Sequence, residues 1–313
     1  GKGEIAKTTM YVGYDTPKGA ENISLAINEE TGDVSLSWDA VTEGVNGGYV
    51  GDVKYDVVRY PDKTVVAKGI TETSFSDKIA SKDFMAYAYG VKAYNDKKTG
   101  EEVRSDYKVY GDAINLPYSE GFDSEDAMAY FTIIDNNNDD SKWFYNYTDG
   151  NGEARYKYNK DNVGDDWLIT PPTKVRKGKT YIVKFKARES NTKYTNKFSV
   201  AYGEGNTVEA MTTPAFAEDI TVTSKEEEEY TFSVKAEKDM MLGIGFHVTS
   251  EKSNGSLYIT NFSIEEDPTS PTPEIKDIDL WGNIVNQETP TSNGMYKFST
   301  TAIDPVSMVT GSK

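Results

Sequence analysis

Oxygen-bearing side chains are concentrated in one short segment of this chain, residues 134–143, which read Ile-Asp-Asn-Asn-Asn-Asp-Asp-Ser-Lys-Trp. Asp135, Asn137 and Asp139 stand at alternate positions, so their oxygens can converge on a hard cation when the chain curls. The helix–loop–helix calcium pattern is not matched, because Asp140 occupies its glycine position and strands are expected on both sides. The segment predicts either another kind of calcium loop or a turn in which Asn and Asp bond to their own backbone.

Residues suited to catalysis are few. His247 is the single histidine; it lies in an apolar strand-like run, and no nucleophile-elbow motif accompanies it. Asp165 and Asp166 are the most suggestive carboxylate pair for a glycosidase, but adjacent strand residues point to opposite faces and cannot share one substrate. The chain has no Cys, which excludes disulfides, thiol catalysis and thiolate metal sites. We therefore expect that the protein is not an enzyme.

Aromatic residues gather directly after the acidic segment. Trp and Tyr rings can stack on sugar faces while neighbouring polar groups bond the hydroxyls. The candidates for ligand binding are Trp143, Tyr145, Tyr156 and Tyr158. The alternative is that these residues are core or rim residues of a sheet, and Trp38 and Trp167 are interpreted as core anchors.

The charge balance excludes some partners. With 34 Lys and Arg against 51 Asp and Glu, the formal net charge is -17, which repels nucleic acid phosphates and anionic membrane surfaces. Neither a signal peptide nor a hydrophobic run of spanning length is present, so nucleic acid binding and membrane insertion are not expected. The beginning, Gly-Lys-Gly, is not a natural start.

Short alternating apolar runs separated by turn residues recur along the chain, and 22 Tyr suit half-exposed antiparallel strands. The clearest runs are residues 35–38, 55–60, 64–67, 87–93, 180–187, 198–202, 230–234, 241–248 and 257–264. Strands at this spacing predict sandwiches or barrels. We expect an all-β chain in which an immunoglobulin-like sandwich is followed by a jelly-roll β-sandwich, with partial flanking modules.

Turn-rich and Pro-rich segments divide the chain. Residues 1–18 are interpreted as the end of a preceding module and a connector, and residues 19–114 as the first sandwich. Residues 115–267 form the expected jelly roll. Residues 268–313 begin with a Pro-rich linker, which cannot maintain a sheet ladder, and continue as the start of a further β module.

The first sandwich resembles the fibronectin type III family. Ser35-Leu36-Ser37-Trp38 matches the strand with the core Trp, residues 55–59 match the next strand, and residues 87–95 match the tyrosine corner and following strand. The resemblance implies that the hydroxyl of Tyr87 binds an upstream backbone group. It implies a spacer or a protein-binding module.

The second sandwich resembles the cleaved-adhesin, or choice-of-anchor, jelly-roll family of Bacteroidetes surface proteins, which includes haemagglutinin regions of gingipains. Three motifs carry the resemblance: Glu120-Gly121-Phe122-Asp123, then Ile134-Asp135 with Trp143 eight residues after Asp135, then residues 165–172, Asp-Asp-Trp-Leu-Ile-Thr-Pro-Pro. In that family the acidic loop is associated with structural calcium. The resemblance implies a Ca²⁺ site made by Asp135, Asn137 and Asp139, with Glu120 as a further ligand.

The loop departs from the family pattern at two positions. Asn137 stands where an acid is usual, and Asp140 stands where glycine is usual, so a weaker site and a strained turn are expected. The two resemblances together imply a non-catalytic adhesion or carbohydrate- or protein-binding segment of a modular, secreted or cell-surface protein associated with the outer membrane. Its expected partners are a host protein or glycan and other modules of the same chain. The alternatives are a structural spacer and an accessory domain of a secreted hydrolase.

Overall fold

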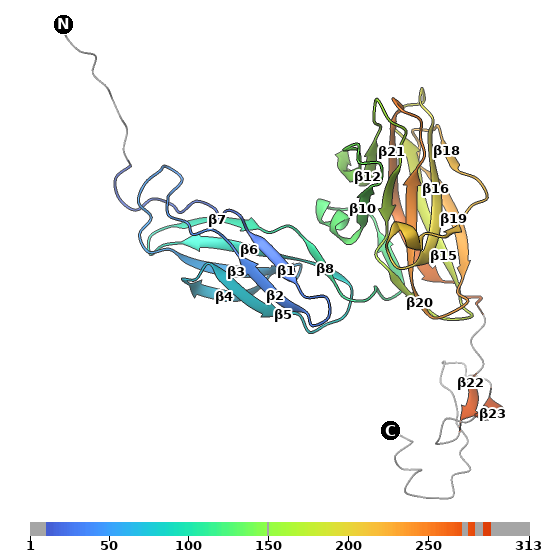
Figure 1. The fold of residues 1–313 in the computed structure, drawn as a ribbon, viewed down its shortest axis with the longest axis horizontal. Helices are drawn as coiled ribbons and strands as arrows, with labels where there is room; N and C mark the ends of the chain where they lie inside the picture. Colours follow the sequence, from blue (N-terminus) through green and yellow to red (C-terminus); the bar gives the residue numbers. More distant parts are fainter. Residues whose placement is uncertain (1–10, 149, 271–274, 279–283, 289–313) are drawn as a thin grey trace, which may run out of the picture.

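The computed structural model describes residues 11–148, 150–270, 275–278 and 284–288, and these residues form two successive β-sandwiches (Figure 1). The predicted all-β architecture is confirmed, since the described helical segments are two short 3-10 turns, η1 (Glu125–Tyr130) and η2 (Val208–Ala210). Within the described residues, no helix has the length and apolarity needed to cross a membrane.

The first sandwich packs a three-stranded sheet against a five-stranded sheet. The sheet orders are β1-β2-β5 and β4-β3-β6-β7, with β8 paired to β6. The strands are β1 (Ser24–Ile27), β2 (Asp33–Ser37), β3 (Lys54–Tyr60), β4 (Thr64–Ile70), β5 (Ser74–Lys78), β6 (Met85–Tyr94), β7 (Thr99–Arg104) and β8 (Lys108–Tyr110). Alternation places Val34 and Leu36 of β2 in the core, where they meet inward residues of β3 and β6.

Aromatic residues anchor this first core. The rings of Trp38 and Tyr55 meet edge to face with centroids 5.3 Å apart. The Tyr55 hydroxyl accepts a hydrogen bond from the N–H of Val41 at 2.9 Å, so it ties the chain back to an upstream backbone group. The sequence assigned that role to Tyr87, which is buried in the same core. Both tyrosines are buried in this core, and the sequence pattern does not show which of the two hydroxyls bonds to the backbone.

The described part of the expected connector packs onto the first sandwich. Pro17 forms an isolated bridge with Gly44, and the side chain of Asp15 is fully covered. The Asp15 carboxylate accepts hydrogen bonds from the N–H groups of Thr16, Asn46 and Gly48. These bonds fix residues 44–48 against the incoming segment.

The second sandwich consists of a seven-stranded and a six-stranded sheet. The first has the order β10-β13-β20-β16-β17, with β14 paired to β20 and β18 to β16. Its strands are β10 (Thr132–Asp135), β13 (Asp166–Ile169), β14 (Thr173–Val175), β16 (Asn196–Glu204), β17 (Thr213–Pro214), β18 (Ile220–Val222) and β20 (Met240–Val248).

The six-stranded sheet has the order β11-β12-β21-β15-β19, with β9 paired to β21. Its strands are β9 (Tyr118–Glu120), β11 (Trp143–Thr148), β12 (Asn151–Lys157), β15 (Thr180–Glu189), β19 (Glu228–Lys235) and β21 (Ser256–Glu266). In β15 alternate residues, among them Tyr181, Val183 and Phe185, point inward, where they join residues of both sheets in one core. Two mostly antiparallel sheets closed over one core give the predicted jelly-roll-type sandwich.

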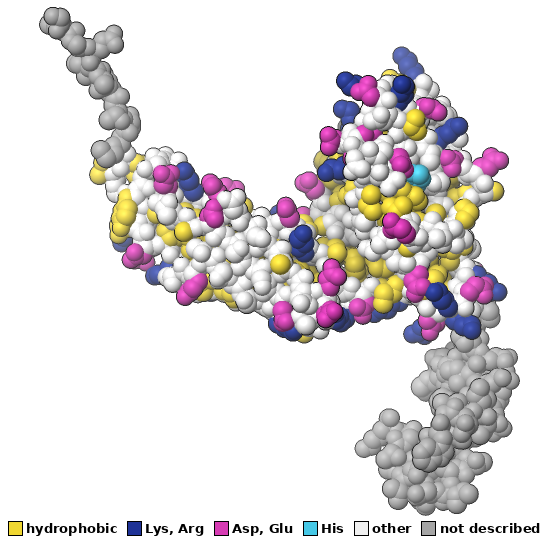
Figure 2. Space-filling model, viewed as in Figure 1, with side chains coloured by type: hydrophobic (Ala, Val, Ile, Leu, Met, Phe, Trp, Pro, Cys, Tyr) yellow, Lys and Arg dark blue, Asp and Glu magenta, His cyan; other side chains and the backbone are white. Residues whose placement is uncertain are grey.

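A small apolar cluster lies on the outer side of the seven-stranded sheet. Trp167 and Ile169 pack there against Ala201 and Met211, and the segment around η2 covers them. Figure 2 shows hydrophobic side chains gathered around the single histidine on this face. Trp167 is therefore a buried anchor, as expected, but it anchors this outer cluster.

The two sandwiches meet through short backbone contacts. The N–H of Ile114 donates to the carbonyl of Pro172 at 2.8 Å, and that of Lys174 donates to the carbonyl of Ile114 at 3.0 Å. Beyond the second sandwich, β22 (Ile275–Ile278) and β23 (Ile284–Glu288) pair antiparallel. The remainder of the expected Pro-rich linker and further module, and most of the segment before residue 11, lie outside the described residues.

Candidate functional site

Two carboxylates face each other at the edge of the seven-stranded sheet. Asp135 ends β10, Asp166 begins β13, and the two residues are direct partners in the antiparallel register. Directly opposed residues project their side chains to the same face, where two like charges destabilise a sheet. The loop after β10 brings a third carboxylate, Asp139, to the same place, and ligand atoms of all three lie within 4.8 Å of one another.

The loop is organised by its own side chains. The two oxygens of Asp135 accept hydrogen bonds from the N–H groups of Asp139 (3.0 Å) and Asp140 (2.8 Å). Asp139 in turn accepts the N–H of Ser141 at 2.8 Å. Asn138 and Asp140 have φ of 55° and 65°, in the left-handed region. The predicted Asx-type turn is therefore present, and Asp140 stands where glycine would carry no steric cost.

Asp166 is not explained by this turn. Its side chain is fully buried, and its Oδ1 has no hydrogen-bond partner. Desolvation, together with the nearby carboxylates of Asp139 and Asp135, raises the pKa of Asp166 to about 7. A buried carboxylate without a partner is costly unless a proton or a cation compensates for it.

The oxygens around Asp166 fit a hard cation. The Oδ1 of Asn137 is also buried without a partner, while its amide nitrogen donates to Asp139 at 3.1 Å. Three carboxylates and an amide oxygen are the donor set that Ca²⁺ prefers. Asp135 and Asp139 are thus brought together with Asp166 as residues that would hold the ion, and Asn137 is joined to them through its hydrogen bond to Asp139.

Glu120 lies elsewhere. It ends β9, which pairs with β21 in the six-stranded sheet, and its carboxylate accepts the N–H of Phe122 at 2.6 Å. It lines a hollow of about 280 Å³ with Pro61 and Tyr107 of the first sandwich and Asp126 of η1. Desolvation raises the pKa of Glu120. The structure therefore places Glu120 between the sandwiches, outside the carboxylate cluster.

Three of the four predicted aromatic residues face the core, and the fourth, Tyr158, follows the end of β12. Trp143 and Tyr156 are register partners, each about 1% exposed, and belong to the core. The Trp143 indole N–H donates to the backbone carbonyl of Asp166 at 3.4 Å, so the ring helps to fix the backbone that carries the Asp166 carboxylate. Tyr145 packs partly against the same core, whereas Tyr158 is exposed.

A groove of about 570 Å³ lies beside the acidic loop. Its walls come from the loop, from β11 and from the segment after β12. Tyr158 and Phe144, each 37% exposed, are its aromatic members. Its polar members are Asp139, Asp140, Ser141, Lys142, Lys157, Asn159, Lys160 and Asp161. The Asn159 side chain donates to the carbonyl of Asp139 at 3.2 Å, and this bond holds the segment after β12 against the acidic loop.

His247 takes part in a structural pair. Its Nε2 lies 2.7 Å from an oxygen of Asp165, and its ring stacks on Trp167 with centroids 4.3 Å apart. Asp165 also accepts the amide N–H of Asn136 at 2.9 Å. As expected, Asp165 and Asp166 point to opposite faces, one to this pair and one to the cluster.

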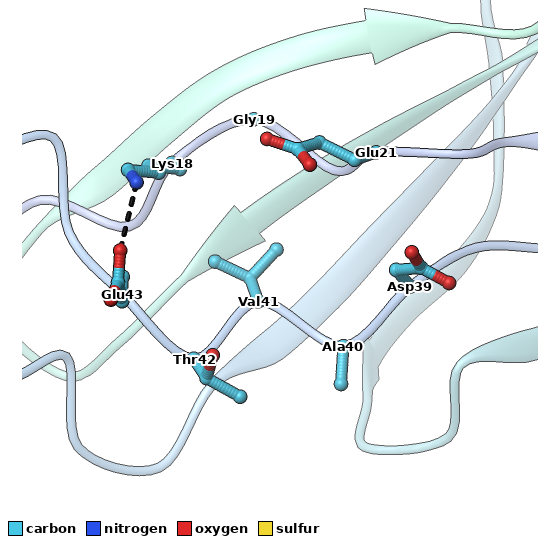
Figure 3. A pocket seen from close by; sticks show the side chains of 8 residues that line it. All are labelled: Lys18, Gly19, Glu21, Asp39, Ala40, Val41, Thr42 and Glu43. Carbon is cyan, nitrogen blue, oxygen red and sulfur yellow. Dashed lines mark hydrogen bonds and ion pairs between the residues drawn. The ribbon is translucent and has the colours of Figure 1, made fainter.

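Another hollow, of about 180 Å³, lies in the first sandwich between the incoming segment and residues 39–43 (Figure 3). Lys18 and Glu43 form an ion pair across it at 2.9 Å, and Glu21 and Asp39 line its other end. The Asp39 carboxylate accepts the Asn22 amide N–H at 2.6 Å. Of the three carboxylates that line this hollow, only Glu43 forms an ion pair among the described residues.

Two functional residues were missed in the sequence. Asp166 was considered as half of a catalytic pair and as part of the third resemblance motif, and not as a metal ligand, although a carboxylate that begins an apolar strand, Trp167-Leu168-Ile169, signals a compensated buried charge. Phe144 was passed over in favour of its neighbours Trp143 and Tyr145, although strand alternation puts it on the opposite face from both.

Comparison with known proteins gives structural neighbours only. No family model matches the sequence, and no curated protein matches it. The K1 cleaved adhesin domain of Lys-gingipain from Porphyromonas gingivalis W83 is 15% identical with a TM-score of 0.41, covering 49% of this chain and 99% of that domain. The K3 domain of the same protein is 13% identical with a TM-score of 0.38, covering 47% and 96%.

Carbohydrate-binding modules are also among the structural neighbours. A xylan-binding domain from Paenibacillus barcinonensis is 13% identical with a TM-score of 0.32, covering 48% of this chain and 92% of that domain. The predicted resemblance to cleaved-adhesin domains is confirmed as a likeness of fold. The fibronectin type III resemblance of the first sandwich stays a prediction.

Proposed function

We propose that this chain is a non-catalytic binding segment of a modular secreted or cell-surface protein, in which the second sandwich holds a structural Ca²⁺ ion and binds a saccharide in the groove beside it. The observation that carries the proposal is the convergence of Asp135, Asp139 and the buried Asp166, whose Oδ1 has no hydrogen-bond partner. Calcium supplies the positive charge that keeps these carboxylates ionised together.

The ion would act on binding through the shape of the loop. Asp139 contributes to the cluster and also lines the groove, so the ion's ligand and the groove wall belong to the same loop. A loop fixed in advance loses less conformational entropy when a ligand binds. Phe144 and Tyr158 offer exposed ring faces for the apolar side of a sugar, and Asn159 and Ser141 offer polar groups for its hydroxyls.

The arrangement of the acids supports binding without catalysis. Asp166, whose pKa of about 7 would suit a general acid, is fully buried and faces the cluster. His247 is occupied by Asp165 and stacked on Trp167. Glycosidase chemistry needs two accessible carboxylates across a cleft, whereas Asp135 and Asp165 are engaged in hydrogen bonds and Asp166 is buried.

The test is binding of the full chain to a panel of immobilised polysaccharides in excess calcium. Tyr158→Ala and Phe144→Ala should each weaken binding about tenfold or more, because stacked aromatic contacts contribute roughly 1–3 kcal/mol when buried by a ligand. Tyr147→Ala is the matched control, since Tyr147 is 64% exposed on β11 and does not line the groove. Absence of binding to every saccharide would overturn the proposal and favour a structural spacer.

A further inference from the structure

We infer that the saccharide is acidic, and that its acidic groups are bound by a basic strip on the outer face of the six-stranded sheet. This strip is continuous with the groove. This inference rests on the proposed function and names the chemistry of its ligand. It begins from the charges of the side chains that point away from the core on β11, β12, β21, β15 and β19.

That face is basic although the protein is acidic. Six Lys and Arg against three Glu occupy its outward positions, on a chain whose formal net charge is -17. The basic residues are Arg155, Lys157, Lys184, Lys186, Arg188 and Lys235. A local excess of cations against the overall composition is the signature of an anion-binding surface.

A row of stacked side chains crosses four strands of this face. Phe144 is the register partner of Arg155, Arg155 of Tyr258, and Tyr258 of Arg188. The Arg155 guanidinium lies 5.5 Å from the ring centroids of both Phe144 and Tyr258, and that of Arg188 lies 3.9 Å from the Tyr258 centroid. Cation–π contacts therefore hold both guanidinium groups beside these rings on the outer face of the sheet.

The two arginines differ in their charge compensation. Arg188 donates to both oxygens of Glu153, at 2.6 and 2.5 Å. Among the described residues, Arg155 donates only to neutral oxygens, those of Ser256 (3.0 and 3.2 Å) and Asn146 (3.3 Å). A fixed guanidinium that lacks a carboxylate can pair with a planar carboxylate or a sulfate of a ligand.

The strip and the groove are one surface. Phe144 lines the groove and stacks on Arg155, and Lys157 lines the groove on the same strand as Arg155. A chain of sugars lying in the groove against Phe144 and Tyr158 would carry its acidic groups past Lys157 and Arg155. The acidic remainder of the molecule acts weakly on such a ligand, because charges more than about 8–10 Å away are screened at physiological salt.

The experiment measures binding of the full chain, in calcium, to immobilised dextran, hyaluronan and dextran sulfate. Poly(dT), a polyphosphate that has no pyranose rings, is the control for charge alone. We expect at least one acidic polysaccharide to bind about tenfold or more tightly than dextran, with the difference shrinking as salt rises. Hyaluronan and dextran sulfate distinguish carboxylate from sulfate. Poly(dT) bound as tightly as the acidic polysaccharides would reduce the strip to unspecific charge and overturn the inference.

Two variants locate the effect. Lys157→Gln removes an exposed charge and should weaken acidic-polysaccharide binding about two- to fivefold, as expected for a solvent-exposed ion pair. Arg155→Gln should weaken it further, and Arg155→Lys should restore part of the binding, which a purely structural role would not predict. Lys174→Gln, which removes an exposed lysine of β14 in the seven-stranded sheet, outside the strip and the groove, is the control. Dextran bound as tightly as both acidic polymers would reject this inference and leave the proposed function intact.

Discussion

Asp166 illustrates how a single buried carboxylate implies a ligand. It faces Asp135 across a strand pair, lies in the cluster with Asp139, and keeps an oxygen without a partner. Hydrogen bonds within the loop account for Asp135 and Asp139 but leave the buried charge of Asp166 uncompensated. At neutral pH this carboxylate must therefore take up a proton or a cation.

Asp166→Asn tests this compensation. In excess calcium the substitution should abolish most of the metal's stabilisation, which is about 2.7 kcal/mol at a calcium concentration one hundred times the Kd. In chelator at pH 8 the same variant should be at least as stable as the parent, because it removes a buried charge. Thermal unfolding in both buffers measures this reversal. Asp161→Ala, which removes an exposed groove acid outside the cluster, is the control. A calcium shift that survives in Asp166→Asn would refute the site.

The pH dependence in chelator follows from the raised pKa of Asp166. Its folded-state pKa is about 7, against about 3.9 for an unfolded Asp. The folded state then holds the proton more tightly, so this group's contribution is most favourable below about pH 4 and declines as the pH rises to about 7. We expect metal-free protein to lose stability over this interval and Asp166→Asn to lose less. Denaturant midpoints at pH 5 and pH 8 measure the difference.

At the residue scale, the sequence predicts which kinds of side chain form the site better than it predicts which individual residues do. Asp135, Asn137 and Asp139 stand at alternate positions of one segment, so their spacing allows convergence on a cation but fits an Asx turn equally well. Asp166 arrives from a strand some thirty residues later, and only the register of β10 and β13 brings it opposite Asp135. Glu120 was added by resemblance, and its strand lies in the other sheet.

At the scale of elements, period-two alternation predicts well where the strands lie, but predicts poorly which face of each strand meets the core. The predicted runs fall within β2, β3, β4, β6, β15, β16, β19, β20 and β21. Alternation separates Phe144 from Trp143 and Tyr145, but it does not say which set faces the core. Trp143 and Tyr156 were expected at the ligand because they are aromatic, and they are buried because their face of the sheet meets the other sheet.

The loop between β10 and β11 tests the expected strain at Asp140. Its φ of 65° costs an ordinary L-residue about 1 kcal/mol, whereas Gly adopts it freely and Asp tolerates it. In chelator, Asp140→Gly should be more stable than Asp140→Ala by about 1 kcal/mol, with the charge removed equally in both. Denaturant unfolding gives the order. Equal stabilities of the Gly and Ala variants would show that this backbone conformation carries no cost.

At the scale of the whole molecule, the two sandwiches have separate cores and few shared contacts. The cores contain no common residue. Among the described residues, the contacts between the units include backbone bonds around Ile114, the packing of η1 against β6 and β8 beside the hollow at Glu120, and an ion pair of Arg104 with Asp126 at 3.6 Å. Exposed ion pairs contribute about 1 kcal/mol or less. Each sandwich should therefore unfold largely by itself.

Calorimetry of the full chain with and without calcium tests this separation. The proposed calcium ligands all belong to the second sandwich, so the metal should stabilise that unit by mass action and leave the other unchanged. We expect two transitions, and the midpoint temperature of one of them should rise by about 5–10 °C in calcium. A gain of about 2.7 kcal/mol in the free energy of unfolding implies this shift for a unit of this size. Trp38→Ala, which opens a cavity in the first core, should lower only the transition that calcium leaves in place. A single transition that responds to both changes would show instead that the contacts around Ile114 and Glu120 couple the sandwiches into one cooperative unit.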